Sequence, residues 1–159
     1  MATQLKDFAT SVVAVVEPET AALVVAQLMR KHHIGALIVV DAQEKNRPVG
    51  IVTDRDLVLE LMAEGLDPAV FTAGDIMTVD LVCATPEMDA MDAVQLMKSH
   101  RLRRLVITDE TGRLVGIVTM EDVLELLTRE LVNLASGLAG ARDRDIHERG
   151  EKETRARHD

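Results

Sequence analysis

Aromatic residues are almost missing from this chain. It has 159 residues, of which two are Phe and none is Trp or Tyr. A hydrophobic core must therefore be built from Val, Leu, Ile, Ala and Met. Many proteins that bind single-stranded nucleic acid stack the bases on aromatic side chains, and this chain has almost none to offer.

Cysteine and positive charge are also scarce. The one cysteine, Cys83, excludes an intramolecular disulfide and a multi-cysteine metal site, and we expect it to be a small buried hydrophobe. The formal net charge is -9, and the sequence has no long basic run. Because phosphate contacts dominate nucleic-acid affinity, this charge argues against binding to nucleic acid or to an anionic membrane surface.

Long hydrophobic runs are missing as well. The apolar stretch from Val12 to Val16 is too short for a signal-peptide core or a membrane span. Apolar residues make up 47% of the chain and charged residues 28%, which is the balance of a globular protein. We therefore expect a cytoplasmic protein.

An internal repeat organises the rest of the sequence. Pro18-Glu19 returns as Pro86-Glu87 and Leu28-Met29 as Leu96-Met97, an offset of 68 residues, which also relates Leu37 to Leu105 and Asp41 to Asp109. The offset then falls to 66, and the segment 49–53 (VGIVT) returns as 115–119. The two-residue slip lies in the polar segment before Pro48, where an indel in a surface turn is expected.

Each copy predicts the order strand, helix, strand, strand, helix. We expect short first strands at 11–16 and 81–84, and helices that begin at the two Pro-Glu pairs. Helical spacing places Leu23, Ala26 and Met29 on one face, with Met91, Val94 and Met97 as their equivalents. The strands at 36–40, 49–53, 104–108 and 114–119 are continuously apolar, which is typical of strands buried on both faces.

The fold class is therefore α/β, with two equivalent units. One unit of about 60 residues is marginal alone, so we expect the two to pack sheet to sheet with pseudo-two-fold symmetry. The predicted first domain covers 5–66, and the linker with the second domain covers 67–138. The segment 139–159 is charged and poor in apolar residues, so we expect disorder or a frayed helical extension.

The same motif ends the last strand of each copy. Gly50 leads to Thr53, Arg55 and Asp56, and in the second copy Gly116 leads to Thr119, Glu121 and Asp122. A Thr at the start of a helix can bind a phosphate oxygen together with the backbone N–H groups. An Asp one turn later can accept hydrogen bonds from ribose hydroxyls. The motif also fits a capping box, which needs no ligand, so both interpretations stay open.

The doubled unit resembles a pair of cystathionine β-synthase (CBS) domains, often called a Bateman module. The resemblance rests on the Asp75-Ile76-Met77-Thr78 segment, the Pro-Glu…Leu-Met helices, the segment 102–109 (LRRLVITD) and both Gly-to-Asp motifs. It implies that the clefts between the copies bind an adenine nucleotide (AMP, ADP or ATP) as a regulatory ligand, with S-adenosylmethionine or an NAD-type molecule as alternatives. No cofactor is required. It also implies a homodimer, and it is similar to small stand-alone bacterial proteins linked to stress responses.

The resemblance implies two ligand sites, each drawing on both copies. The first site combines Thr53, Arg55 and Asp56 with Asp75, Leu102, Arg103 and Arg104. The second combines Thr119, Glu121 and Asp122 with Asp7, Val12, Ile34, Gly35 and Ala36. The first site is the one we expect to hold phosphate, because arginine forms bidentate phosphate contacts. A solvated strand edge is the alternative role of Arg103 and Arg104.

Three other functions are alternatives to this interpretation. Catalysis is disfavoured because the sequence has no nucleophile-and-base arrangement, phosphate loop or HExxH motif, so we expect no enzyme. His32 and His33 are adjacent on a helix and point in different directions, which disfavours a metal site. A ligand-free dimerisation module that contacts an unidentified protein target remains an open alternative.

Overall fold

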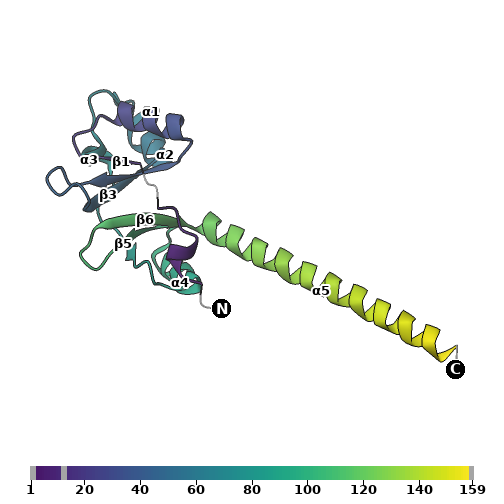
Figure 1. Cartoon of the computed structure of the whole chain (residues 1–159). Helices are drawn as coiled ribbons and strands as arrows, with labels where there is room; N and C mark the ends of the chain where they lie inside the picture. The colour runs from purple at the N-terminus through teal and green to yellow at the C-terminus, as the bar shows by residue number, and fades with distance from the viewer. Residues whose placement is uncertain (1–2, 12–13, 158–159) are drawn as a thin grey trace. The chain divides into compact units, whose positions relative to one another are not determined.

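We describe a computed structural model of the chain, covering residues 3–11 and 14–157. Compactness divides it into two units, Met1–Met120 and Glu121–Asp159. The first unit holds two three-stranded sheets, ordered β1-β2-β3 and β4-β5-β6. Both repeats of the sequence therefore lie in one compact unit (Figure 1).

The first sheet contains β1 (Val15–Val16), β2 (Ala36–Val40) and β3 (Pro48–Thr53). The second contains β4 (Cys83–Ala84), β5 (Arg104–Thr108) and β6 (Leu114–Thr119). In each sheet the first strand pairs in parallel and the last two form an antiparallel hairpin. The predicted strand-helix-strand-strand-helix order and α/β class are confirmed, although the first strands are only two residues long.

The side chains of β2 point alternately to its two faces, and both faces are buried, which explains why the strand is apolar throughout. Leu37 and Val39 pack with residues of α1, whereas Ile38 and Val40 pack with Val106 of the other sheet. Successive side chains of a strand point to opposite faces, so a strand with helices on one side and a sheet on the other is apolar throughout. The predicted packing of sheet against sheet is thus present in the shared cluster around Ile38.

The longer helices of the two repeats begin later than the sequence suggested. Helix α1 spans Ala22–His32 and α4 spans Ala90–His100, so each Pro-Glu pair lies in the turn before its helix. The buried face of α1 is Ala22, Val25 and Met29. The predicted face is correct at Met29 and at its equivalent Met97, which are buried. It is wrong at Leu23 and at its equivalent Met91, which are exposed. Val25 lies four residues before Met29, and Ala22 lies three residues before Val25, which is helical spacing.

Short helical elements complete the first unit, and one long helix forms the second. The short elements are η1 (Leu5–Asp7), α2 (Asp54–Asp56), the π-helical turn η2 (Leu57–Met62) and α3 (Ala73–Ile76). Gly65 follows η2 and has a left-handed backbone with a φ of 66°. Helix α5 runs from Met120 to Ala156, so the charged C-terminal segment continues as helix. Among the described residues, no helix is long and apolar enough to cross a membrane.

The two repeats exchange the segments that precede their first strands. Residues 3–10 bond to the second repeat: Leu5 N–H donates to the carbonyl of Met88, and Thr10 pairs with Ile117. Residues 68–78 bond to the first repeat through the matching positions: Ala73 N–H donates to Thr20, and Thr78 pairs with Ile51. This reciprocal pattern is the pseudo-two-fold relation expected from the sequence.

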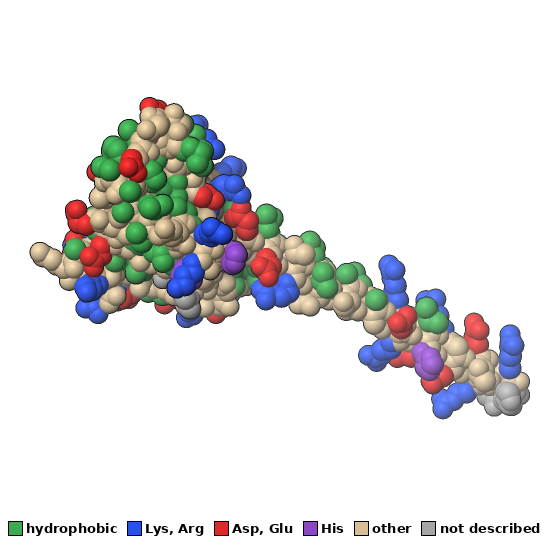
Figure 2. Space-filling model, turned by 90° about the horizontal axis from the view of Figure 1, so that it is seen from above, with side chains coloured by type: hydrophobic (Ala, Val, Ile, Leu, Met, Phe, Trp, Pro, Cys, Tyr) green, Lys and Arg blue, Asp and Glu red, His purple; other side chains and the backbone are tan. Residues whose placement is uncertain are grey.

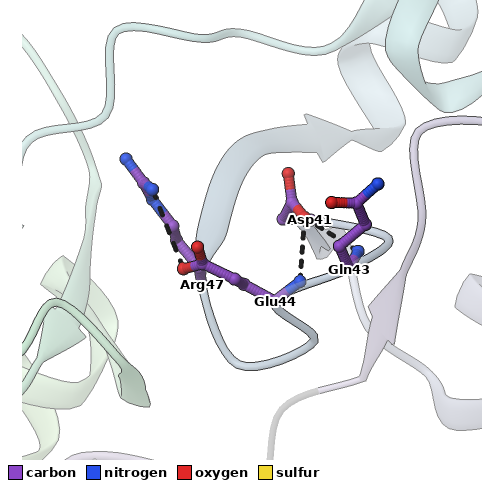
Figure 3. Close-up of polar contacts among 4 residues, drawn as sticks. All are labelled: Asp41, Gln43, Glu44 and Arg47. Carbon is purple, nitrogen blue, oxygen red and sulfur yellow. Dashed lines mark hydrogen bonds and ion pairs between the residues drawn. The ribbon is translucent and has the colours of Figure 1, made fainter.

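The turn between β2 and β3 is closed by its own polar groups. Asp41 Oδ1 accepts the N–H groups of Gln43 and Glu44 at 2.8 and 2.9 Å, and Arg47 pairs with Glu44 at 3.7 Å (Figure 3). These hydrogen bonds, chiefly that from Glu44, hold the pKa of Asp41 below its usual value. This polar turn is where the repeat offset slips by two residues, as expected for an indel at the surface.

The prediction that Cys83 is buried is wrong. In the two-residue strand β4 its side chain is exposed, while that of Ala84 is buried. Alternation along the strand allows only one of these neighbours to face the core. Partial burial nevertheless raises the pKa of the Cys83 thiol, which favours its neutral form.

Candidate functional site

The first Gly-to-Asp motif forms the junction between β3 and α2. Thr53 ends the strand and caps the helix: its Oγ1 accepts the Asp56 N–H at 3.2 Å, and Asp56 Oδ2 accepts the Thr53 N–H at 2.8 Å. The capping-box interpretation is therefore correct for this copy. It does not exclude a ligand, because the cap leaves Thr53 and Asp56 half-buried at the start of a helix.

Residues at the start of β2 lie directly beside this junction. Ala36 pairs with Thr53 across the hairpin, and Asp54 N–H donates to the carbonyl of Gly35 at 2.9 Å. Ile34, Gly35 and Ala36 are half-buried. They are thus immediate neighbours of the first repeat's own motif, whereas the resemblance had grouped them with the motif of the second repeat.

Arg104 brings a cation from the second repeat to the same place. It is the first residue of β5, and its Nη2 lies 3.7 Å from the position that a Cβ on Gly35 would occupy. Asp54 Oδ2 lies 3.1 Å from that position. The absence of a side chain at Gly35 therefore leaves a small space between a carboxylate of the first repeat and a guanidinium of the second.

Asp54 is a residue of this neighbourhood that the sequence analysis missed. The predicted motif residues are the Thr and the Asp at which the two copies agree, together with Arg55 and Glu121. Asp54 immediately follows Thr53, but its equivalent in the second copy is Met120, so the repeat gave it no support. Its position directly after the Thr that ends β3 could have identified it, because that residue must lie beside the start of β2.

The remaining residues of the predicted phosphate site lie on several different elements. Arg55 is exposed in the first turn of α2. Leu102 and Arg103 precede β5, where the Arg103 carbonyl accepts the Met120 N–H at 2.8 Å, the counterpart of the bond from Asp54 to Gly35. Asp75 caps α3: its Oδ2 accepts the Thr72 N–H at 2.8 Å.

The predicted second site is described only in part. Asp7 caps η1 by accepting the Gln4 N–H at 3.1 Å, as Asp75 does at the matching position. Thr119 ends β6 in the first unit, and Glu121 and Asp122 lie in the first turn of α5 in the second unit. Val12 lies outside the described residues. The composition of this site stays a prediction.

Both repeats carry a left-handed residue just before this region. His33 and Arg101 end α1 and α4 with φ values of 53° and 55°, and they are equivalent positions of the repeat. A left-handed residue is common after a helix, although glycine is the usual choice. The turn directs the chain into Gly35 and Arg103.

Within the described residues, no cluster of three His, Cys, Asp or Glu could hold a metal ion.

The family follows from a direct comparison with known proteins. The profile of the CBS domain matches residues 5–63 and 73–129, which is most of the chain. This chain belongs to the CBS domain family. It is a tandem CBS pair, and the family resemblance seen in the sequence is confirmed.

Individual CBS proteins match over different lengths. The CBS domain-containing protein YhcV of Bacillus subtilis is 38% identical over 135 residues, 85% of this chain and 91% of that protein. The uncharacterized protein MK0525 of Methanopyrus kandleri is 40% identical over 109 residues, 69% of this chain but only 55% of that longer protein.

A solved structure extends the comparison to a bound state. The CBS domain pair of protein MJ0100, in complex with 5′-methylthioadenosine and S-adenosyl-L-methionine, has a TM-score of 0.73 and 25% identity. The match covers 82% of this chain and 99% of that one. Its ligands are those of that protein.

Proposed function

We propose that this CBS pair is a non-catalytic regulatory module that binds an adenosine-containing ligand between its repeats. The observation that carries the proposal is the approach of Arg104, from the second repeat, to Gly35 and Asp54 beside the Thr53 helix start. A guanidinium, a Thr hydroxyl and the N–H groups at a helix start are groups that bind phosphate. Asp56 supplies a carboxylate for ribose hydroxyls.

The two predicted sites are proposed to bind different ligands, one with phosphate and one without. The cleft at Thr53 has Arg55, Arg103 and Arg104 within its predicted set and is assigned to the phosphate-bearing ligand, with AMP, ADP and ATP as candidates. The residues predicted for the site at Thr119 and Asp122 include no arginine. A ligand without phosphate suits it better, and the 5′-methylthioadenosine of the MJ0100 complex is one such molecule.

The output is proposed to act in trans through a homodimer. A ligand can shift a conformational equilibrium only through a difference in affinity between two states. A ligand site that draws on both repeats would meet this condition, because a ligand held by both Asp54 and Arg104 favours the state in which these residues are close. The altered dimer would then be recognised by a protein target.

Ligand binding is tested by titrating AMP, ADP, ATP, NAD, S-adenosylmethionine and 5′-methylthioadenosine while following melting temperature and heat. A ligand at 100 times its Kd stabilises the folded state by about 2.7 kcal/mol, which raises Tm by about 5 °C or more in a domain of this size. Absence of binding by all six below millimolar concentration refutes the proposal and favours a ligand-free dimerisation module.

The site is tested with Arg104→Gln, and Arg30→Gln in the exposed last turn of α1 serves as the matched control. Loss of a charged hydrogen bond is expected to weaken ATP binding by about tenfold or more in Arg104→Gln, whereas Arg30→Gln should bind ATP as the wild type does. Asp56→Asn keeps an oxygen that can cap Thr53 but weakens binding to two ribose hydroxyls. If ATP affinity is unchanged in both Arg104→Gln and Asp56→Asn, the phosphate site is elsewhere.

A further inference from the structure

Helix α5 carries a row of exposed leucines that the proposed ligand clefts do not use. Their side chains are between 42% and 66% exposed, and the row consists of Leu124, Leu127, Leu131, Leu134 and Leu138. The buried apolar residues of the helix are Val123 and Leu126, which are not members of the row. A helix with an apolar stripe is stable in water when that stripe is covered.

The spacing of these leucines identifies what covers them. They recur at intervals of 3, 4, 3 and 4 residues, and Ala141 continues the series by three. This is the a and d pattern of a coiled coil, in which each side chain inserts between four residues of a facing helix with the same period. We name the row from Leu124 to Ala141 the leucine seam. Its 17 intervals at 1.5 Å extend about 26 Å.

Charge along the seam favours an identical partner. With Leu131 at an a position, the flanking e and g positions between Thr128 and Gly137 are Thr128, Glu130, Ala135 and Gly137, of which only Glu130 is charged. A partner selected by opposite charge would need charged flanks to recognise. Two copies of this helix meet with little repulsion, and Ala135 and Gly137 allow close approach.

The seam ends where the sequence becomes charged. Asp145 takes the next a position and Glu148 the next d position, and Arg144 pairs with Glu148 on the same helix at 3.1 Å. In Figure 2 the middle of the helix shows apolar and uncharged surface, whereas charged side chains gather over its C-terminal part. The apolar segment therefore ends within the helix, so a contact formed by the seam would have a limited length.

Most of the seam lies beyond the part of the chain that makes it a CBS pair. The family profile ends at residue 129, so Leu131, Leu134 and Leu138 belong to an extension that the CBS fold does not explain. We propose that the leucine seam of α5 is a self-association surface that packs against the same seam of a second copy of this chain. This contact needs no ligand and uses none of the proposed cleft residues.

The test uses the full-length chain and the double variant Leu131→Gln/Leu138→Gln, since glutamine is a good helix former. The matched control is Val132→Gln/Ile146→Gln, two side chains on the same helix that are 59% and 69% exposed but lie outside the seam. Two readouts are compared over a range of protein concentration: molar mass in solution, and hydrogen–deuterium exchange of the amides from 128 to 141.

The wild type and the control are expected to show protection of these amides that rises with concentration. The seam variant loses this protection, and its self-association weakens at least about tenfold for each leucine layer removed, about 100-fold for two. Protection that does not depend on concentration means that another part of the same chain covers the seam, and absent protection in the wild type means that a different protein does. Either result overturns the proposal, as does equal loss in the control.

Failure of this inference is distinguishable from failure of the proposed function. The seam variant is expected to keep the nucleotide-induced rise in melting temperature, because residues 131 and 138 are outside the ligand clefts. A dimer formed by another surface would persist in molar mass while the amides from 128 to 141 exchange freely, and that result also overturns the leucine seam as the contact.

Discussion

At the scale of single residues, two glycines fix how closely the exchanged segments approach the hairpins. A Cβ on Gly116 would meet the backbone oxygen of Thr10, and a Cβ on Gly50 would meet the side chain of Met77. A methionine side chain can move aside, whereas the Thr10 carbonyl, which accepts a hydrogen bond from the Ile117 N–H, cannot do so easily. The two equivalent glycines are therefore unequal in their tolerance of substitution.

Gly116→Ala is expected to destabilise the chain by about 1–3 kcal/mol, the usual cost of overpacking. Gly50→Ala should cost less, because Met77 can change rotamer. Gly150→Ala is the control: no atom lies within 4 Å of its added Cβ, and alanine in place of glycine within a helix stabilises by about 1 kcal/mol. Urea unfolding of the three variants measures the order, and equal effects of Gly116→Ala and Gly50→Ala would contradict the packing argument.

The aspartates that close the two hairpin turns make stability depend on pH. Asp109 Oδ1 accepts hydrogen bonds from the Thr111 hydroxyl at 2.7 Å and from the Thr111 and Arg113 N–H groups, and the first of these is the main cause of its lowered pKa. The pKa of Asp41 is also lowered, chiefly by its hydrogen bond from Glu44. A folded-state pKa below the unfolded value gives stability that is present above the unfolded pKa and is lost as pH falls through the folded pKa.

The double variant Asp41→Asn/Asp109→Asn should therefore lose less stability than the wild type when the pH is lowered from roughly 5 toward 2. The urea midpoint recorded at several pH values gives this slope. Asp80→Asn, at an exposed position outside the turns, is the control and should keep the slope of the wild type. An unchanged slope in the double variant would show that other carboxylates dominate acid unfolding.

At the scale of elements, the segment before each first strand belongs structurally to the other repeat. Leu5 is fully buried, and its N–H donates to Met88 of the second repeat at 3.0 Å. Ala73, the matching residue, lies in the core cluster of the first repeat with Val25 and Met29. Each repeat is therefore incomplete without a segment that its own sequence copy does not contain.

Leu5→Ala is expected to cost about 2–5 kcal/mol, as for other buried leucines, and to loosen the second repeat first. Hydrogen exchange of the amides from 86 to 90 should increase more than that of the amides from 18 to 22. Leu23→Ala, at a side chain that is 41% exposed, is the control and should leave both regions nearly unchanged. Faster exchange confined to the first repeat would contradict the exchange of segments.

At the scale of the whole molecule, the two repeats are expected to unfold together. Ile38, Val40 and Val106 form one buried cluster from both sheets, so neither repeat keeps its core when the other opens. The two reciprocal segments add a second link between the repeats. A duplicated sequence that could have produced two independent domains thus forms a single compact unit.

Ile38→Ala should lower the stability of both repeats by a similar amount, about 2–5 kcal/mol, because it opens a cavity in the shared cluster. The calorimetric and van't Hoff enthalpies of the transition that melts the two sheets should agree in the wild type and the variant. Two resolved transitions for the sheets, one of them unaffected by Ile38→Ala, would show that the repeats are independent.

The sequence by itself determined the repeat, the four long strands and the position of the first Thr-to-Asp motif. These features depend on local period and on identity between the two copies, and both are readable without knowledge of contacts. The family resemblance followed from the same ordered motifs. The predicted ligand residues remain a prediction, because their use depends on a ligand and not on the fold.

Tertiary structure alone decided which segments meet. The exchange of residues 3–10 and 68–78, the approach of Arg104 to Gly35 and the exposed side of β4 at Cys83 all depend on contacts between residues far apart in the chain. The local sequence pattern could not predict these contacts, because two similar copies allow each segment to pack on its own repeat or on the other. The reciprocal hydrogen bonds and the shared core selected the exchanged arrangement.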